Sequence, residues 1–258
     1  MNFNFSLFYQ YSNKNIPTSF LEWFIGFTEG DGSFVVNSRG NVVFVLTQHF
    51  ENVSILKEIQ STFQFGNVIR QGKTTFRFVV YKKTDIYKLI QLFNGNLILP
   101  SKKKSFSLWV HQYNRMNEKK VILLSKNVVP SIKDNWLAGF TDAEGCFTCS
   151  LLKNSSAYRF RYLVAQKGIE NKGILEILQS FFGGKVTSMH VPDMYQLTVN
   201  GCKNAEKVMH YFDTYSLQTK KKESFSIWKS VHDDLLNKKH QQKDSREILM
   251  KKVITINT

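Results

Sequence analysis

The chain carries two copies of one short motif, 113 residues apart. The first copy is Trp23-Phe24-Ile25-Gly26-Phe27-Thr28-Glu29-Gly30-Asp31-Gly32, and the second is Trp136-Leu137-Ala138-Gly139-Phe140-Thr141-Asp142-Ala143-Glu144-Gly145. Each copy is an apolar helical stretch that ends in a carboxylate followed at once by glycine. A repeated helix with an acid at its end predicts two similar sites on one pseudo-symmetric body.

The repeat continues well beyond the motif, which is typical of a duplicated unit. Leu46-Thr47-Gln48 matches Val164-Ala165-Gln166, residues 59–68 match 177–186, and the triplet Lys102–Lys104 matches Lys220–Lys222. The offset drifts from 113 to 119, so the second copy gains only a few loop residues. We therefore expect an N-terminal unit at 1–116, a linker at 117–133 and a C-terminal unit at 134–258.

Hydrophobic periodicity predicts the same α+β order of elements in both units. The first unit is expected to contain helices at 20–31, 52–63, 84–93 and 101–116 and strands at 33–38, 41–48, 67–71 and 74–80. The second is expected to contain helices at 134–144, 171–182, 202–214 and 219–236 and strands at 146–153, 158–166, 185–190 and 194–199. A last helix is expected to begin at Ser245, a residue suited to an N-cap.

The net charge of the chain indicates which classes of partner it can bind. Lys and Arg number 35 against 20 Asp and Glu, a net charge of +15, which favours nucleic acid or an anionic membrane surface. No apolar run reaches the length of a bilayer span, so we expect no membrane partner. The first 15 residues lack the features of a signal or transit peptide. A composition rich in Phe, Asn, Lys and Ile fits an AT-rich organellar genome, so we expect the protein to work in the organelle that makes it.

Small residues on the two motif helices suggest close packing. Gly26 and Gly30 lie four residues apart, as do Gly139 and Ala143, and residues at this spacing share a helix face. Glycine inside a helix costs about 1 kcal/mol relative to alanine. A close approach of the two helix backbones explains why these residues occur there.

Asp31 and Glu144 fall at the C-terminal ends of the two helices, where the macrodipole disfavours negative charge. Two such ends brought together repel unless a cation lies between them, and Mg²⁺ prefers carboxylate, water and phosphate oxygens. Paired acids in a basic protein point to phosphodiester hydrolysis. Two sites would match two antiparallel DNA strands. Glu29 and Asp142 are interpreted as solvated or capping acids.

These motifs resemble the signature of the LAGLIDADG homing endonucleases, in the branch with two motifs in one chain, from about Phe20 to Val231. The resemblance implies an αββαββα fold in each half, curved antiparallel sheets and a central helix–helix interface. It implies Mg²⁺ or Mn²⁺ at Asp31 and Glu144, beside Gly30 and Ala143. It also implies a glutamine and a lysine near each acid, assigned to Gln48 and Gln166 and to Lys102 and Lys221. A shift of one residue within each lysine triplet stays open.

In that fold the strands would lie in the major groove of double-stranded DNA. The candidate contacts in the first half are Asn37, Arg39, Arg70, Gln71, Lys73 and Arg77. Those in the second half are Lys153, Asn154, Arg159, Arg161, Lys185, His190 and Gln196. Arg159 and Arg161 are expected on one face of a strand and Phe160 and Tyr162 on the other.

Three functions compete. The first is a monomeric, intron-encoded DNA endonuclease with a long asymmetric target, because the two halves differ at the candidate reading positions. The second is a maturase that binds intron RNA without cleaving DNA, and the third is a DNA-binding regulator. An acid at the end of both motif helices favours the nuclease, because a pure binder has no use for two mutually repelling carboxylates.

Overall fold

The computed structural model describes residues 2–12, 16–152 and 155–257. Internal contacts divide the chain into two compact units, Met1–Ala143 and Glu144–Thr258. The sequence repeat instead divides the chain at the linker and assigns the second motif helix to the C-terminal unit. The contacts assign this helix to the first unit because it packs there. Among the helices that the structure describes, none combines the length and apolar character that a bilayer crossing requires.

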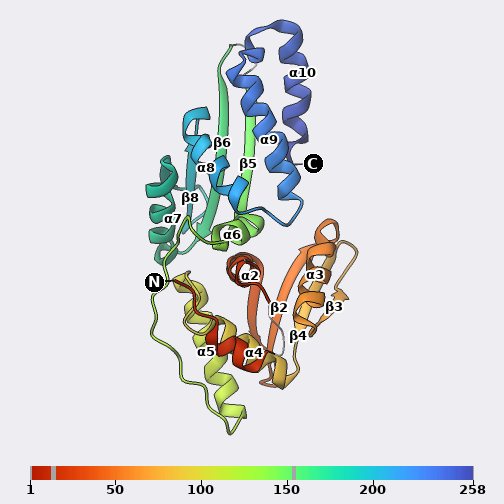
Figure 1. Ribbon diagram of the computed structural model, residues 1–258, viewed down its shortest axis with the longest axis vertical. Helices are drawn as coiled ribbons and strands as arrows, with labels where there is room; N and C mark the ends of the chain where they lie inside the picture. The colour runs from red at the N-terminus through yellow and green to blue at the C-terminus, as the bar shows by residue number, and fades with distance from the viewer. Residues whose placement is uncertain (1, 13–15, 153–154, 258) are drawn as a thin grey trace. The chain divides into compact units, whose positions relative to one another are not determined.

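Unit 1 contains one antiparallel sheet with helices packed against it (Figure 1). Its elements are α1 (Ser6–Tyr11), α2 (Thr18–Asp31), β1 (Gly32–Val36), β2 (Val42–His49), η1 (Phe50–Asn52), α3 (Val53–Phe63), β3 (Asn67–Arg70), β4 (Thr75–Val80), α4 (Lys83–Phe93), α5 (Pro100–Met116) and α6 (Trp136–Glu144). The strand order is β1-β2-β4-β3. The first hairpin turns at Gly40, whose φ of +80° suits glycine.

One face of this sheet forms the core of unit 1. Phe44 and Leu46 of β2 and Phe78 of β4 are fully buried, whereas the residues between them on β2 are only half-buried. The Phe44 ring contacts those of Phe24 in α2 and Phe93 in α4. The alternation along β2 therefore leaves the opposite face, called here the outer face, without aromatic packing.

Unit 2 repeats this arrangement of sheet and helices and adds three helical segments after α9. Its elements are β5 (Gly145–Leu151), β6 (Tyr158–Lys167), α7 (Ile169–Phe182), β7 (Lys185–Ser188), β8 (Met194–Asn200), α8 (Cys202–Thr214), α9 (Lys221–Leu236), η2 (Lys239–Gln241), α10 (Lys243–Ile254) and η3 (Thr255–Asn257). The strand order is β5-β6-β8-β7. Two similar αβ units with four-stranded antiparallel sheets confirm the predicted fold class.

Two helices differ from the expectation. The last helix begins at Lys243 and its N-cap is Gln242, so Ser245 lies in the first turn. The Arg246 guanidinium in its first turns donates to the carbonyl oxygens of Leu152 and Ser155, so this end of the helix is held by long-range contacts. Helix α1 was not predicted; its Phe8 is fully buried and packs edge-on against Phe63 of α3.

The two motif helices cross at their glycines. A Cβ at Gly26 of α2 would overlap the carbonyl oxygen of Trp136 and lie 2.8 Å from the backbone nitrogen of Phe140. A Cβ at Gly139 of α6 would overlap the carbonyl oxygen of Trp23 and lie 2.8 Å from the nitrogen of Phe27. The reciprocal contacts confirm the predicted close approach of α2 and α6, and they place it at Gly26 and Gly139.

Candidate active site and nucleic-acid interface

Asp31 and Gln48 meet at the end of α2. Asp31 is the last residue of the helix and is half-buried. The Gln48 side-chain amide donates a hydrogen bond to Asp31 Oδ2 at 2.5 Å. Asn52 Nδ2 donates to Gln48 Oε1 at 3.3 Å, which fixes the amide at both ends. The structure thus brings together two residues that the sequence assigned to one site, and it adds Asn52, which the sequence did not indicate.

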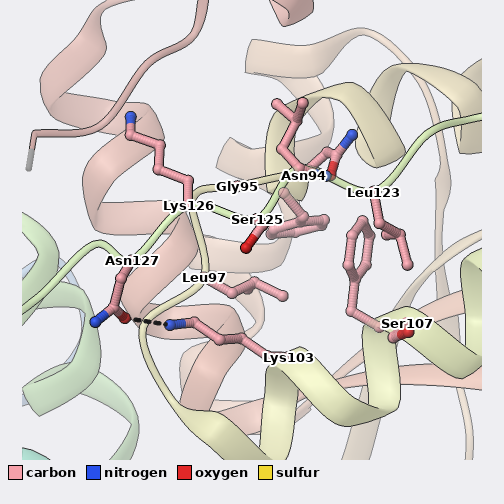
Figure 2. Close-up of a pocket in the computed structure, with 12 residues that line it drawn as sticks. Asn94, Gly95, Leu97, Lys103, Ser107, Leu123, Ser125, Lys126 and Asn127 are labelled. Atoms are coloured by element: carbon pink, nitrogen blue, oxygen red, sulfur yellow. Dashed lines mark hydrogen bonds between the residues drawn. The ribbon is translucent and has the colours of Figure 1, made fainter.

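The lysine triplet in α5 separates into three environments. Lys102 Nζ donates to the carbonyl oxygen of Gly32 at 2.5 Å, one residue beyond Asp31. Lys103 Nζ instead donates to Asn127 Oδ1 at 3.1 Å. It lines a cavity of about 360 Å³ between α5 and residues 123–127, as Figure 2 shows. Lys104 is exposed. Of the three, Lys102 is therefore the one whose amine the structure holds beside the acid.

The register of unit 2 matches that of unit 1. Gly32, which follows Asp31, pairs with Leu46 across the first hairpin, and Gly145, which follows Glu144, pairs with Val164 across the second. Gln48 and Gln166 each lie two residues after that partner, so they occupy equivalent positions. Both glutamines are buried.

The helix register agrees. The Trp109 indole donates to the Val35 carbonyl, and that of Trp228 donates to the Thr148 carbonyl. This offset of 119 aligns Lys102 with Lys221 rather than Lys220. Burial raises the pKa of the Cys146 thiol, and the positive charge of Lys221 opposes this rise. Lys221 therefore lies near the start of β5.

Glu29 and Asp142 are buried rather than solvated, which corrects the interpretation of these acids. Glu29 is 1% exposed. Its Oε1 accepts the backbone N–H groups of Ile98 and Leu99 at 2.7 and 2.6 Å, and its Oε2 accepts the Trp136 indole at 2.6 Å. Glu29 thus holds the segment that leads into α5, but it does not cap the helix, because both of these N–H groups precede Pro100.

The second buried acid makes the reciprocal contact, since Asp142 Oδ2 accepts the Trp23 indole N–H at 2.8 Å. Each motif helix therefore donates its tryptophan to an acid of the other. Burial raises the pKa of Glu29 to about 7, although the N–H donors of Leu99, Trp136 and Ile98 and the charge of Lys102 oppose this rise. Both acids recur in register with both tryptophans, and this was the signal that could have identified the pairs.

Around Asp31 the Gln48 amide nitrogen donates to the carboxylate, and the Lys102 amine donates to the main-chain oxygen of Gly32. Gly30 and Ala143 are half-buried and directly precede Asp31 and Glu144 in α2 and α6. In the described part of the chain, no three side chains of His, Cys, Asp and Glu gather in a way that could hold a metal ion.

The candidate DNA contacts of unit 1 divide between two places. Arg77 of β4 pairs with Thr47 and Ile69, on the outer face of the sheet. Arg70 pairs with Phe76 on the opposite face, and its guanidinium donates to the carbonyl oxygens of Gly72 and Lys73. Arg70 and Arg77 therefore do not share a face, because a strand alternates its side chains. The remaining residues, Asn37, Arg39, Gln71 and Lys73, are exposed in the two hairpin turns.

The outer face of unit 2 carries more of the expected residues. Arg159 and Arg161 lie on it, while Phe160 and Tyr162 are fully buried on the other face, which confirms the predicted alternation. Lys185 and Gln196 share the outer face through their pairing with Thr198 and Ala165. His190 is exposed in the β7–β8 turn. Lys153 and Asn154 lie outside the described residues.

Solved structures with a similar fold include LAGLIDADG meganucleases. One is the meganuclease I-AabMI bound to uncleaved DNA, with a TM-score of 0.76 and 18% identity over 92% of this chain and 99% of that one. Another is the homing endonuclease I-GzeII in complex with its DNA target, with a TM-score of 0.77 and 19% identity over 92% and 98%. At these identities the likeness concerns the fold.

Sequence relatives carry intron-related names. "Probable intron-encoded endonuclease 4" of Neurospora crassa is 36% identical over 241 residues, which make up 91% of this chain and 44% of the relative. "Intron-encoded RNA maturase bI4" of Saccharomyces cerevisiae is 31% identical over 139 residues, 52% of this chain and 20% of that protein. The chain thus spans less than half the length of either relative.

The profile of the LAGLIDADG endonuclease family matches residues 24–113 and again 137–232. The two matches cover both motif helices and both sheets, and they include Asp31, Gln48 and Lys102 together with Glu144, Gln166 and Lys221. The chain belongs to the LAGLIDADG endonuclease family.

Proposed function

We propose that this chain is a site-specific endonuclease that hydrolyses one phosphodiester bond in each strand of double-stranded DNA. The observation that carries the proposal is the assembly at the end of α2, where the Gln48 amide donates to Asp31 and the Lys102 amine donates to the carbonyl oxygen of the next residue, Gly32. The same three positions recur at Glu144, Gln166 and Lys221. Each half would therefore cut one strand.

The residues of this assembly have separate roles in the proposal. Gln48 orients the Asp31 carboxylate, because its amide is itself held by Asn52. Lys102 contributes a positive charge that stabilises the negative charge developing on the phosphate in the transition state. Gln166 and Lys221 would act in the same way beside Glu144.

Carboxylate oxygens, such as those of Asp31 at the end of α2, are ligands that fit a hard divalent cation such as Mg²⁺ or Mn²⁺. Asp31 would bind such a cation together with the backbone at Gly30, and Glu144 would do so together with the backbone at Ala143. When bound, such a cation polarises the phosphodiester and promotes ionisation of the attacking water. The single carboxylate at the end of each motif helix leaves room for phosphate and water, which Mg²⁺ usually retains.

Double-stranded DNA is the proposed partner of the outer faces of both sheets. The net charge of +15 supports a polyanionic partner, and related structures were solved with bound DNA. Two motifs in one chain need no second copy, so the protein would act as a monomer. Its halves carry different side chains, and the target would be asymmetric. The names of the relatives support an intron-encoded origin in an organelle.

The test is cleavage of a library of DNA that contains host-gene and randomised sequences, with Mg²⁺, followed by sequencing of the cut ends. The protein is expected to cut both strands of a long, asymmetric site. Asp31→Asn and Glu144→Gln should each abolish double-strand cleavage and leave binding largely intact. Full activity in either variant would refute the assignment of the acids.

A maturase activity is the second candidate, and the similarity to the yeast maturase favours it over a pure regulator. Splicing of the host intron in the presence of the protein, with or without Asp31→Asn, tests it. Splicing that survives this substitution would show that RNA binding uses other residues than DNA cleavage.

A further inference from the structure

Two arginines on the outer faces hold a donor that nothing in the described chain satisfies. The Nε atoms of Arg77 in unit 1 and Arg161 in unit 2 are buried and have no hydrogen-bond partner. Both side chains lie in the interior of a sheet, Arg77 between Thr47 and Ile69 and Arg161 between Thr148 and Asn200. A donor kept from water without a partner costs free energy, so these sites gain from a partner that comes from outside.

The position within the sheet indicates which part of DNA is that partner. Arg39 and Lys73 lie in exposed turns, where side chains reach the phosphate backbone. The middle of a sheet laid in the major groove faces the base edges instead. An arginine in that position matches the O6 and N7 acceptors of guanine, because its guanidinium donates two parallel hydrogen bonds.

The repeat register shows that the two halves present different residues at these places. Arg77 corresponds to Gln196, because Gln196 pairs with Ala165 and Thr187 as Arg77 pairs with Thr47 and Ile69. Arg161 corresponds to Val43, because Arg161 pairs with Thr148 as Val43 pairs with Val35. Each half therefore has arginine at one of these two positions: unit 1 at the position of Arg77 and unit 2 at the position of Arg161.

We propose that Arg77 and Arg161 each read a guanine. At the equivalent positions of the other half, Gln196 would read an adenine and Val43 would contact the methyl group of a thymine. This assignment rests on the proposed function and names its substrate more closely. The position of Arg77 and Gln196 adjoins the glutamine of the active site and is the inner one. The position of Val43 and Arg161 is four residues further along β2 or β6.

The spacing of the two positions predicts where the guanines fall. Four residues of strand span about 13 Å, which corresponds to roughly four base pairs of duplex at 3.4 Å each. The guanine read by Arg77 should thus lie about four base pairs nearer to the cleavage point than the guanine read by Arg161. The inner position of the other half-site should prefer adenine.

The experiment measures base preference at every target position, by selection for binding and separately by selection for cleavage. Arg77→Gln should change the inner preference of one half-site from guanine to adenine, by roughly ten- to a hundredfold. Gln196→Arg should make the opposite change in the other half-site. The double variant should exchange the two inner preferences and leave the outer ones as they are.

Arg39→Gln is the matched control, since Arg39 lies in an exposed turn. It should weaken binding to all sequences alike and lower the salt dependence. If Arg77→Gln behaves as Arg39→Gln does, with no change of base preference, Arg77 is a phosphate contact and the assignment is overturned. If the base preferences exchange in the binding selection but neither the variants nor the unaltered protein cut DNA, the assignment of Arg77 and Gln196 holds and the nuclease proposal fails.

Discussion

Two carboxylates at the end of α2 differ in environment although only one residue separates them. Asp31 is half-buried and binds Gln48, whereas Glu29 is 1% exposed and accepts three N–H donors. Burial of an acid is tolerated where donors satisfy its oxygens. Glu29 thus joins α2 to the segment before α5 and to α6, whereas Asp31 is held by Gln48 and stays half-buried.

Lys102 and Lys103 should respond differently to truncation. Lys102→Met removes the amine held at Gly32 beside Asp31, so cleavage should slow by a hundredfold or more, on the order of the loss of one transition-state donor, with a smaller change in affinity. Lys103→Met removes only the hydrogen bond to Asn127 and should leave the rate within a few-fold of normal. Single-turnover cleavage and binding isotherms provide the comparison. A larger effect at Lys103 would move the catalytic assignment by one residue.

Asp134 makes stability depend on pH. Burial raises its pKa to about 7, and Glu22 adds to the rise, while the Trp136 N–H bound to its Oδ1 opposes it. The unfolded state releases this proton near pH 3.8, so between pH 3.8 and 7 the folded state binds more protons. The contribution of Asp134 to the unfolding free energy therefore falls as pH rises through this window, by on the order of 4 kcal/mol.

Asp134→Asn keeps an acceptor for Trp136 and removes the ionisation. Thermal unfolding should show the variant more stable than the unaltered protein above pH 7, with the difference vanishing toward pH 3.8. A variant that is less stable above pH 7 would show that Asp134 is a favourable, ionised cap of α6.

At the scale of elements, the crossing of α2 and α6 depends on the absence of two Cβ atoms. The backbones are in contact at Gly26 and Gly139, and reciprocal tryptophan–carboxylate hydrogen bonds lie on either side. The helices thus combine a steric requirement with polar contacts that set their register.

Gly26→Ala should destabilise the protein by about 1–3 kcal/mol, because the new methyl group meets the backbone of α6. Gly173→Ala is the matched control, since its Cβ would meet nothing within 4 Å. Alanine there should stabilise α7 by up to about 1 kcal/mol. Chemical denaturation of both variants measures the difference, and a Gly26→Ala variant as stable as the unaltered protein would contradict the close crossing.

At the scale of the whole molecule, positive charge and duplication act together. The charge of +15 belongs to a chain whose two units each present an open sheet face. Charge alone attracts any nucleic acid, whereas the different residues on the two faces can select a sequence.

DNA affinity should therefore fall steeply with salt. A protein that neutralises roughly six to ten phosphates loses about 10³–10⁵ in affinity between 50 and 200 mM salt. Titration of a labelled duplex at several salt concentrations gives the slope. The selected target should keep its advantage over unrelated DNA at each concentration, and a flat response would argue against DNA as the partner.

Much of this protein could be predicted along the chain. The duplicated motif, the alternation in β2 and β6 and the shared register of Gln48 and Gln166 follow from local periodicity and from repetition, both of which are visible without coordinates. They were enough to predict the α+β units and the close contact of the motif helices. The grouping of a glutamine and a lysine with Asp31 came from the family resemblance, and the repeat supplied their positions.

Only the tertiary structure decided which neighbours each side chain meets. Glu29 is buried because Ile98, Leu99 and Trp136 reach it from 69 to 107 residues away. Lys102 differs from Lys103 because its amine reaches the carbonyl oxygen of Gly32. The Arg70 guanidinium donates to the Gly72 carbonyl oxygen in its own hairpin. These outcomes depend on packing between distant segments, and no periodicity of the sequence encodes the distance between them.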